Sequence, residues 1–396
     1  MRNKVEAGDA IGIRRGQALV FAATAGFTVA STYYFQPLFP VVGASLHVPA
    51  SSASWISTVL QLGYALGLFL VVPLGDYFDR RRLVPLLMVL SAVGLVGISV
   101  SGSLGELLAW CAVVGVTSAV AQVVVGMVAT IATPSQRGAA IGNVMTGLLL
   151  GILLARTVSG LVAQYANWRL VFLGSALAVA LLAWFSASAI PQIPKGHKGT
   201  YRQLLASLGR TFMEEQVVRR AALIGALNFA CFSIFWNTSS LHLSAPPLGL
   251  DAASIGLFGL VGVAGALAAR LAGGLADRGR QWVTSLVMNT LITLSFVILL
   301  AWPDNLWTVI AAVVVLDFGV QGSHISNQSM IFSIRPESRS RITGIYMTAY
   351  FLGGSIGSFF STLAYRDAGY RAVLVGAIVF AVLAVGARMV RMRLAR

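Results

Sequence analysis

The sequence predicts an all-α polytopic membrane protein whose twelve transmembrane helices form two pseudo-symmetric six-helix lobes. Three observations support this prediction. The 396 residues are 57% hydrophobic and only 10% charged, whereas soluble domains are about 25% charged. Apolar runs long enough to cross a bilayer recur along the whole chain. The first half of the chain also resembles the second half.

The apolar runs define the predicted helices. A transmembrane β-barrel would show shorter segments of alternating hydrophobicity instead. The twelve spans cover residues 17–43, 53–75, 83–102, 105–131, 139–163, 170–190, 220–244, 252–275, 283–302, 306–333, 342–364 and 372–390.

The two halves match at corresponding positions. TPSQRGAAIGNVMTGLLLG at 133–151 aligns with RPESRSRITGIYMTAYFLG at 335–353. An even number of spans in each half makes the halves parallel repeats, with a binding site expected at the midplane between them. The predicted organisation is a cytoplasmic tail, a first lobe, a basic linker, a second lobe and a short tail, at 1–16, 17–190, 191–219, 220–390 and 391–396. The linker is expected to hold a short amphipathic helix at Tyr201–Phe212.

The net charge of +15 has a topological explanation. Most lysines and arginines fall into loops on one side of the predicted membrane, and cytoplasmic loops are the positively charged ones. Both termini are therefore expected in the cytoplasm of a bacterial-style inner membrane, with Arg14 and Arg15 preceding an uncleaved first helix. The basic charge then needs no nucleic-acid partner.

The polar residues do not suggest an enzyme. Cys111 and Cys231 lie within predicted spans, and the four histidines are scattered. This pattern predicts no metal site and no cofactor. Within the spans there is also no nucleophile–base pair.

Two loops carry acidic and basic residues at helix ends. They read PLGDYFDRRRL at 73–83 and GGLADRGRQW at 273–282. Aspartate beside arginine can link helices through charge-assisted hydrogen bonds. These loops resemble the G-x-L-A-D-R-x-G-R-R signature of the major facilitator superfamily, and the twelve spans extend the resemblance over the whole chain.

The resemblance implies a transporter that works by alternating access, with a gate formed by these loops. The predicted gating residues are Asp76, Arg80, Arg81, Arg270, Asp277 and Arg278. The first loop departs from the signature, with Val72 and Asp79 in place of glycines and Tyr77 in place of arginine.

A buried arginine is predicted in the fifth span. The stretch GLLLGILLARTVSG at 147–160 is similar to the antiporter signature of the family, but Arg156 stands where that signature has proline. Charged residues within spans usually face the bundle interior and mark functional sites. The alternatives are a structural ion pair or an arginine that reaches the headgroups.

The tenth span carries a polar stripe. Asp317, Gln321, His324 and Gln328 have the spacing i, i+4, i+7 and i+11, which places them on one helical face. Asp317 lies near the middle of the span, where a carboxyl group can take up and release a proton. Histidine exchanges protons near neutral pH. We therefore predict proton coupling by Asp317 and His324; the alternative is an aspartate that only links helices.

The first span ends in YYFQPLFP, residues 33–40, and the seventh span contains Phe235, Trp236 and Asn237. A helix break at Pro37 is tolerated only beside protein or a water-filled cavity. Aromatic rings with amides suit a partly apolar ligand, although tyrosine and tryptophan also favour the membrane interface. The predicted substrate-binding residues are Tyr33, Gln36, Gln122, Arg156, Trp236, Asn237 and Gln321.

Together these features predict a secondary active transporter, not an enzyme. The sequence looks most similar to the twelve-span drug:proton antiporter branch, which implies proton-coupled efflux of a small amphipathic or drug-like molecule by a monomer. An alternative is uptake or symport of a small organic anion recognised by Arg156. A membrane receptor or channel-like protein that does not cycle is a further alternative.

Overall fold

The computed structural model describes residues 12–133, 135–191, 200–262, 268, 271–275, 278–332 and 339–390. Within these ranges, the side chains of Asp76 and of residues 339–341 are not described. The predicted gating residues Arg270 and Asp277 lie outside the described residues, as do most of the two predicted tails.

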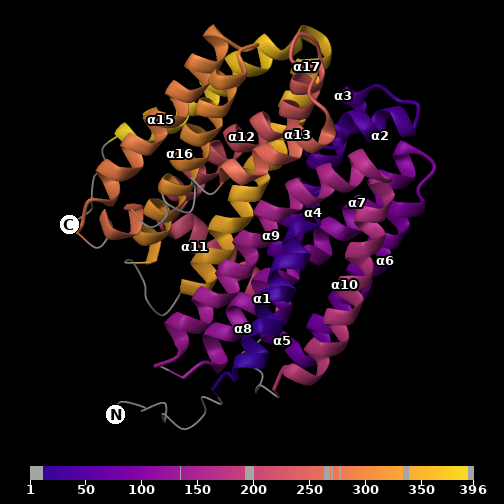
Figure 1. Cartoon of the computed structure of the whole chain (residues 1–396). Helices are drawn as coiled ribbons and strands as arrows, with labels where there is room; N and C mark the ends of the chain where they lie inside the picture. The colour runs from indigo at the N-terminus through magenta and orange to yellow at the C-terminus, as the bar shows by residue number, and fades with distance from the viewer. Residues whose placement is uncertain are drawn as a thin grey trace, which may run out of the picture.

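The described residues form helices joined by short connections, and no strand occurs among them. Figure 1 shows the N-terminal half, indigo to magenta, beside the orange and yellow C-terminal half. The N-terminal half contains α1 (Arg15–Ala30), α2 (Phe39–Ser45), α3 (Ala50–Ala53), α4 (Trp55–Leu70), α5 (Leu74–Tyr77), α6 (Arg80–Val100), α7 (Leu104–Ser118), α8 (Val120–Ile131), α9 (Arg137–Tyr165) and α10 (Trp168–Ala189). The C-terminal half contains α11 (Tyr201–Glu214), α12 (Gln216–Ser244), α13 (Ala252–Leu257), the 3₁₀ helix η1 (Phe258–Gly262), α15 (Gln281–Ala301), α16 (Leu306–Phe332) and α17 (Arg339–Met389).

The predicted all-α membrane fold is confirmed. Nine helices in the described part of the chain are long and apolar enough to span a bilayer, where a helix is one of the two structures that satisfy all backbone polar groups. Leucines and valines on the outward faces of α6 and α10 stay exposed, as expected for surfaces that face lipid. The nine helices account for all predicted spans except the first and the eighth, and α17 contains the last two.

The first predicted span is broken rather than continuous. Between α1 and α2, residues 31–38 form turns. Pro37 has no backbone N–H to donate to the carbonyl oxygen of Tyr33 one turn earlier, and this oxygen accepts from the N–H of Gln36 at 3.2 Å. The hydroxyl groups of Ser31 and Thr32 bond to the carbonyl oxygens of Thr28 and Val29, at 2.6 and 2.8 Å. We call residues 31–38 the first break.

The eighth predicted span is also interrupted. It begins as the six-residue helix α13 and continues as η1, whose sequence FGLVG contains two glycines. Glycine weakens a helix because it loses more backbone freedom on folding than other residues. We call Phe258–Gly262 the second break. A 3₁₀ stretch within a helix often marks a hinge.

The last two predicted spans are joined without a loop. They form the single element α17, whose one non-helical residue is Gly369, with φ 76° and ψ −175°. Only glycine adopts this backbone conformation readily. The chain therefore turns a corner at one residue.

Polar side chains fix several helix starts. The carboxylates of Asp79 and Asp251 accept hydrogen bonds from the backbone N–H groups of Arg81 and Ser254, at 2.9 and 2.7 Å. Such N-caps satisfy donors that have no partner within the helix. In the linker, Thr200 and Gln203 form a capping box at the start of α11, so the structure has a helix where the sequence predicts one.

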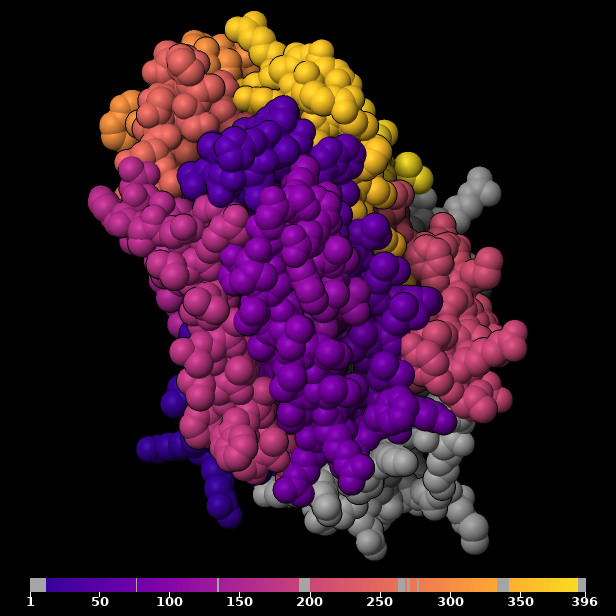
Figure 2. Space-filling model, turned by 90° about the vertical axis from the view of Figure 1, so that its right-hand side faces the viewer, coloured from indigo at the N-terminus to yellow at the C-terminus, as the bar shows by residue number. Residues whose placement is uncertain are grey.

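The linker helix α11 contacts both halves. The Tyr201 hydroxyl donates to the carbonyl oxygen of Leu70 at the end of α4, at 2.5 Å. Leu204 and Leu208 are buried, and α11 packs on α12 and α17. In Figure 2 the N-terminal half covers the face turned to the viewer, and the pink-red α11 lies at its edge.

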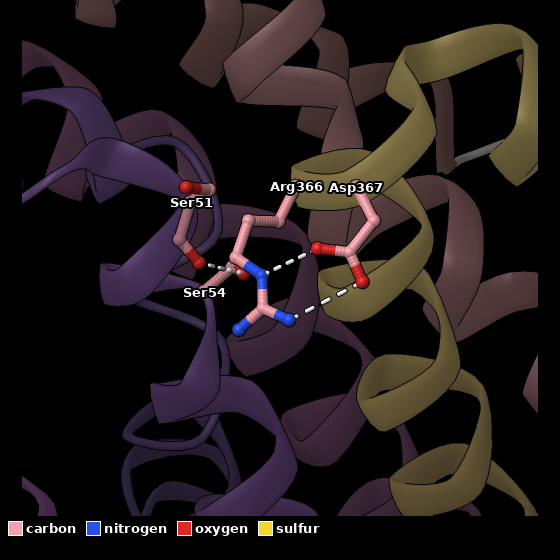
Figure 3. Close-up of polar contacts among 4 residues, drawn as sticks. All are labelled: Ser51, Ser54, Arg366 and Asp367. Atoms are coloured by element: carbon pink, nitrogen blue, oxygen red, sulfur yellow. Dashed lines mark hydrogen bonds and ion pairs between the residues drawn. The ribbon is translucent and has the colours of Figure 1, made fainter.

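The two halves meet through small residues and hydroxyl groups. The hydroxyl of Ser54 is 2.8 Å from that of Thr362 in α17. The Ser355 hydroxyl donates to the carbonyl oxygen of Thr58, at 3.2 Å. Figure 3 shows this end of the molecule, where Ser54 bonds to the carbonyl of Ser51 and Arg366 pairs with Asp367 on α17.

Glycines allow the closest helix contacts. A Cβ atom added to Gly151 of α9 would lie 2.2 Å from the backbone oxygen of Gly26 in α1, and one added to Gly160 would lie 2.3 Å from the oxygen of Ala252 in α13. Helices in membranes often pack through such small residues. Because α9 touches α1 on one side and α13 on another, it joins the two halves.

We expect Gly151→Leu to destabilise the α1–α9 contact, because its side chain cannot fit against the backbone of Gly26. Overpacking of this kind costs roughly 1–3 kcal/mol, and the melting temperature of the purified protein in detergent should fall. Gly174→Leu in α10 is the control, since a Cβ atom there has nothing within 4 Å. Equal melting temperatures for both variants would contradict the described packing.

Candidate functional site

The candidate site is centred on Arg156 of α9, whose side chain is only 2% exposed. Its Nε donates a hydrogen bond to Oε1 of Gln36 in the first break. Its Cζ lies 3.9 Å from the centre of the Trp236 ring, which comes from α12 of the other half. Arg156 therefore connects the two halves through one hydrogen bond and one cation–π contact.

Aromatic rings surround the guanidinium group. Besides Trp236, the rings of Tyr33 and Phe232 lie 5.3 and 5.6 Å from Cζ of Arg156. Tyr33 and Trp236 were predicted from the sequence, whereas Phe232 was not. The spacing of Phe232 and Trp236, four residues apart on one helix, could have revealed it, because such residues share a helical face.

Asp317 of α16 completes the site. Its Oδ1 accepts a hydrogen bond of 3.3 Å from the indole N–H of Trp236, so the same ring contacts Arg156 with its face and Asp317 with its edge. The carboxyl group is buried. Arg156 and Asp317 form no direct ion pair in the part of the chain described here, and Trp236 links them.

Both helix breaks border this site. The first break supplies Tyr33 and Gln36. The second break places Gly259 against Arg156 and Gly262 beside Asp317, where an added Cβ atom would lie 2.8 Å from Cβ of Arg156 and 3.5 Å from Oδ2 of Asp317, respectively. Irregular backbone at membrane depth is tolerated where protein covers it, and transporter sites are often built from broken helices.

The remaining residues of the predicted polar stripe extend away from this centre. The Nδ1 atom of His324 is 3.0 Å from the hydroxyl of Tyr346 in α17, and the ring of Tyr350 lies 4.7 Å from the His324 ring. Gln321 is partly exposed. Asp317 thus faces Trp236 of α12, which connects it to Arg156, whereas His324 faces Tyr346 and Tyr350 of α17.

Two predicted substrate-binding amides lie outside the centre. The Nδ2 of Asn237 donates to the backbone oxygen of Ser358 and to the hydroxyls of Ser361 and Thr362, at 3.0–3.1 Å. Gln122 of α8 interacts with the hydroxyl of Tyr64 in α4. Asn237 therefore links α12 to α17, and substrate contact by Asn237 or Gln122 stays a prediction.

Gln61 of α4 is a polar residue of the interface that was not predicted from the sequence. Its Oε1 accepts hydrogen bonds from the hydroxyls of Ser233 and Ser358, at 3.1 and 3.4 Å. One amide thus links the N-terminal half to α12 and α17. The position of this amide in the apolar stretch WISTVLQLGYALGLFL could have revealed it, because buried amides need hydrogen-bond partners.

The predicted gate is described only in part. Nε of Arg80 donates to the carbonyl oxygen of Gly75 at 2.6 Å, and Nε of Arg81 donates to that of Ala187 at 3.3 Å. Arg278 is exposed. The gating role of these residues stays a prediction.

A separate groove of about 910 Å³ lies between α1 and α9. Alanine, glycine and leucine dominate its lining, with Arg15 near one end. Arg156 and Asp317 are not among its lining residues, so we do not include it in the candidate site.

A helical membrane protein with buried charged residues between its two halves has the features of a secondary transporter. Comparison with known families identifies the family of the chain. Residues 21–358 and 221–394 match the model of the Major Facilitator Superfamily, so the chain belongs to this family of transporters, and not to a family of enzymes.

Known relatives agree with this assignment. The chain is 42% identical over 362 residues to the uncharacterized transporter YgaY of Escherichia coli O157:H7, covering 91% of this chain and 92% of the relative. It is 30% identical to a probable transporter of Streptomyces coelicolor, covering 89% and 82%. The crystal structure of a bacterial homolog of the human lysosomal transporter Spinster, inward-facing and unoccupied, has a TM-score of 0.73 at 14% identity, covering 94% and 95%, and so shares the fold.

We expect Asn237→Ala to lower stability while leaving substrate affinity unchanged, because it removes the Nδ2 donor that three buried acceptors of α17 share. Leaving buried groups unpaired costs about 1–3 kcal/mol each. Melting in detergent and the KM in the transport assay below measure the two effects. Asn143→Ala on the exposed surface of α9 is the control. A raised KM with an unchanged melting temperature would show that Asn237 contacts substrate.

Proposed function

We propose that the protein is a proton-coupled secondary transporter, which moves a small amphipathic molecule by alternating access and carries the proton on Asp317. The observation that carries this proposal is the position of Asp317. Its carboxyl group is buried between the two halves and is connected to Arg156 through Trp236. Ionisable groups inside a membrane protein are costly and typically serve ion or substrate pathways.

Alternating access requires contacts between the halves that can break and re-form. The described contacts near α3 include the hydroxyl hydrogen bonds Ser54–Thr362 and Ser355–Thr58, beside the edge-to-face contact of the Trp55 and Phe359 rings. Each of these hydrogen bonds contributes only about 0.5–1.5 kcal/mol net. The two breaks lie directly at the site, so backbone changes there would alter the surroundings of Arg156 and Asp317 together.

The proposal includes the topology predicted from the sequence. The lobes at 17–190 and 220–390 rock against each other, the linker at 191–219 connects them in the cytoplasm, and both termini face the cytoplasm of a bacterial inner membrane. The transporter works as a monomer. The asymmetric distribution of lysine and arginine among the loops supports this orientation.

The leading version is efflux in exchange for protons. It is supported by the resemblance to drug:proton antiporters and by the mixed aromatic and amide surface of Tyr33, Gln36 and Trp236. The second candidate is uptake of a small organic anion together with a proton. It is favoured by one observation, the buried Nη2 atom of Arg156, which has no hydrogen-bond partner.

The experiment uses inside-out vesicles that contain the protein and a fluorescent pH indicator. Lipophilic cations, neutral drugs, amino acids, sugars and organic acids are added outside without an imposed gradient. Exchange should raise the internal pH, and co-transport should lower it. We expect Asp317→Asn to abolish the response to the active compound, because the amide cannot carry the proton.

Asp367→Asn is the matched control for the vesicle experiment. This carboxylate is exposed and pairs with the neighbouring Arg366, so its loss should leave the pH response intact. A response that persists in Asp317→Asn at the wild-type level would refute proton transfer through Asp317.

A further inference from the structure

The guanidinium group of Arg156 has an unused hydrogen-bond donor. Arginine offers five N–H donors in a planar fork. Nε is taken by Gln36, but Nη2 is buried and lacks any partner in the described structure. Leaving a buried donor unpaired is unfavourable. A donor kept in this state at the centre of a transporter indicates that the missing acceptor is supplied from outside the chain.

The missing acceptor is best matched by a carboxylate. Planar guanidinium groups bind planar carboxylates through charge-assisted hydrogen bonds. Arg156 forms no ion pair with a carboxylate of the described chain, and Asp317 accepts the indole N–H of Trp236. The Nη2 donor of Arg156 is therefore still available to a carboxylate of a ligand.

The surroundings of the guanidinium group suit an apolar, flat molecule. Trp236, Tyr33 and Phe232 lie around it. Phe232 is only partly buried, and its ring is held in place by Phe229, which stacks on Phe232 at 5.3 Å and on Tyr350 at 4.2 Å. Aromatic rings pack favourably against one another at such distances.

Charge balance links this anion to a proton. With Arg156 positive and Asp317 negative, the buried site is neutral. A bound anion would leave one uncompensated negative charge in a medium of low dielectric constant, which is strongly unfavourable. Protonation of Asp317 restores neutrality.

The groups around Asp317 are consistent with this coupling. Among the described residues, the charged and titratable neighbours are Arg156 of α9, Tyr33 of the first break and Tyr350 of α17. His324 lies two turns further along α16. The second break contributes only uncharged residues, FGLVG. Arg156 is thus the one permanent charge described beside Asp317, and its compensation decides whether the carboxyl group ionises.

We propose that Arg156 binds the carboxylate of a small aromatic monocarboxylic acid, whose ring packs against Phe232, and that this anion is bound together with one proton on Asp317. This inference rests on the proton-coupled function proposed above and identifies the substrate class of its second candidate. It makes the coupling co-transport, so that a proton gradient directed into the cell drives uptake.

The test uses matched pairs of probes that differ in charge. Benzoate, phenylacetate and 3-phenylpropionate are compared with their primary amides and with benzylamine. Binding to the full-length protein in detergent is followed by calorimetry from pH 6 to pH 8, where the acids stay ionised. We expect at least one acid to bind at least tenfold more tightly than its amide. Its affinity should weaken about tenfold per pH unit where Asp317 is ionised, as linkage to one proton requires.

Three variants and one control separate the roles of the two charges. Arg156→Gln should weaken acid binding roughly tenfold to a hundredfold, Arg156→Lys less, and the exposed control Arg366→Gln not at all. Asp317→Asn imitates the protonated carboxyl group, so it should keep acid binding but lose its pH dependence. Melting curves without ligand show whether each variant is folded.

The possible failures can be distinguished. If no acid binds more tightly than its amide to the wild-type protein, anion recognition by Arg156 is refuted whatever the variants do. If an acid binds with the same affinity at every pH, the link to the proton is refuted. The proposed function survives both results as long as Asp317→Asn abolishes the pH response in vesicles. It fails, independently of the binding data, if that response persists.

Discussion

Burying a positive charge between the two halves is the constraint on which the rest of the structure depends. Removing one ion from water costs several kcal/mol even after the protein relaxes. Here the cost is offset by the side-chain oxygen of Gln36, by three aromatic rings and by the negative charge of Asp317. Gln36 and Tyr33 belong to the same half as Arg156, whereas Phe232, Trp236 and Asp317 belong to the other half, so part of this compensation depends on the halves being together. The electrostatic environment of Arg156 therefore depends on whether the two halves are in contact at this site.

This requirement also explains the unusual backbone around the site. Gln36 reaches Arg156 because α1 ends at Ala30 and the chain turns before α2. Both α13 and the second break can approach Arg156 because Gly256 of α13 and Gly259 of the break have no side chains. Membrane helices are otherwise regular, because lipid offers no partner for free backbone groups. The irregular segments occur where protein surrounds them.

Much of this arrangement could be predicted from the sequence. Hydropathy defines the spans, and a buried arginine or aspartate in a membrane marks an interior site, so Arg156, Asp317, Tyr33, Gln36 and Trp236 were predicted and do lie together. The sequence did not reveal that Trp236 separates the two charges, because that depends on how α9, α12 and α16 are placed in space. Asn237 illustrates the same limit: it neighbours Trp236 in the chain, but its side chain points to α17. The sequence also did not reveal the 3₁₀ stretch inside the eighth predicted span, since hydropathy does not register how weakly FGLVG favours an α-helix.

Gly369 has a mechanical consequence. The first part of α17 carries Ser355, Ser358 and Thr362, whose hydroxyl groups bond to residues of the N-terminal half. The second part packs on the outside of the C-terminal half. The two parts are connected at one residue that has no side chain, so the angle between them can change there at little cost in backbone energy. The inner helix is therefore able to tilt with the interface while the outer helix, whose Val375, Val379 and Leu383 are exposed, keeps its place against the lipid.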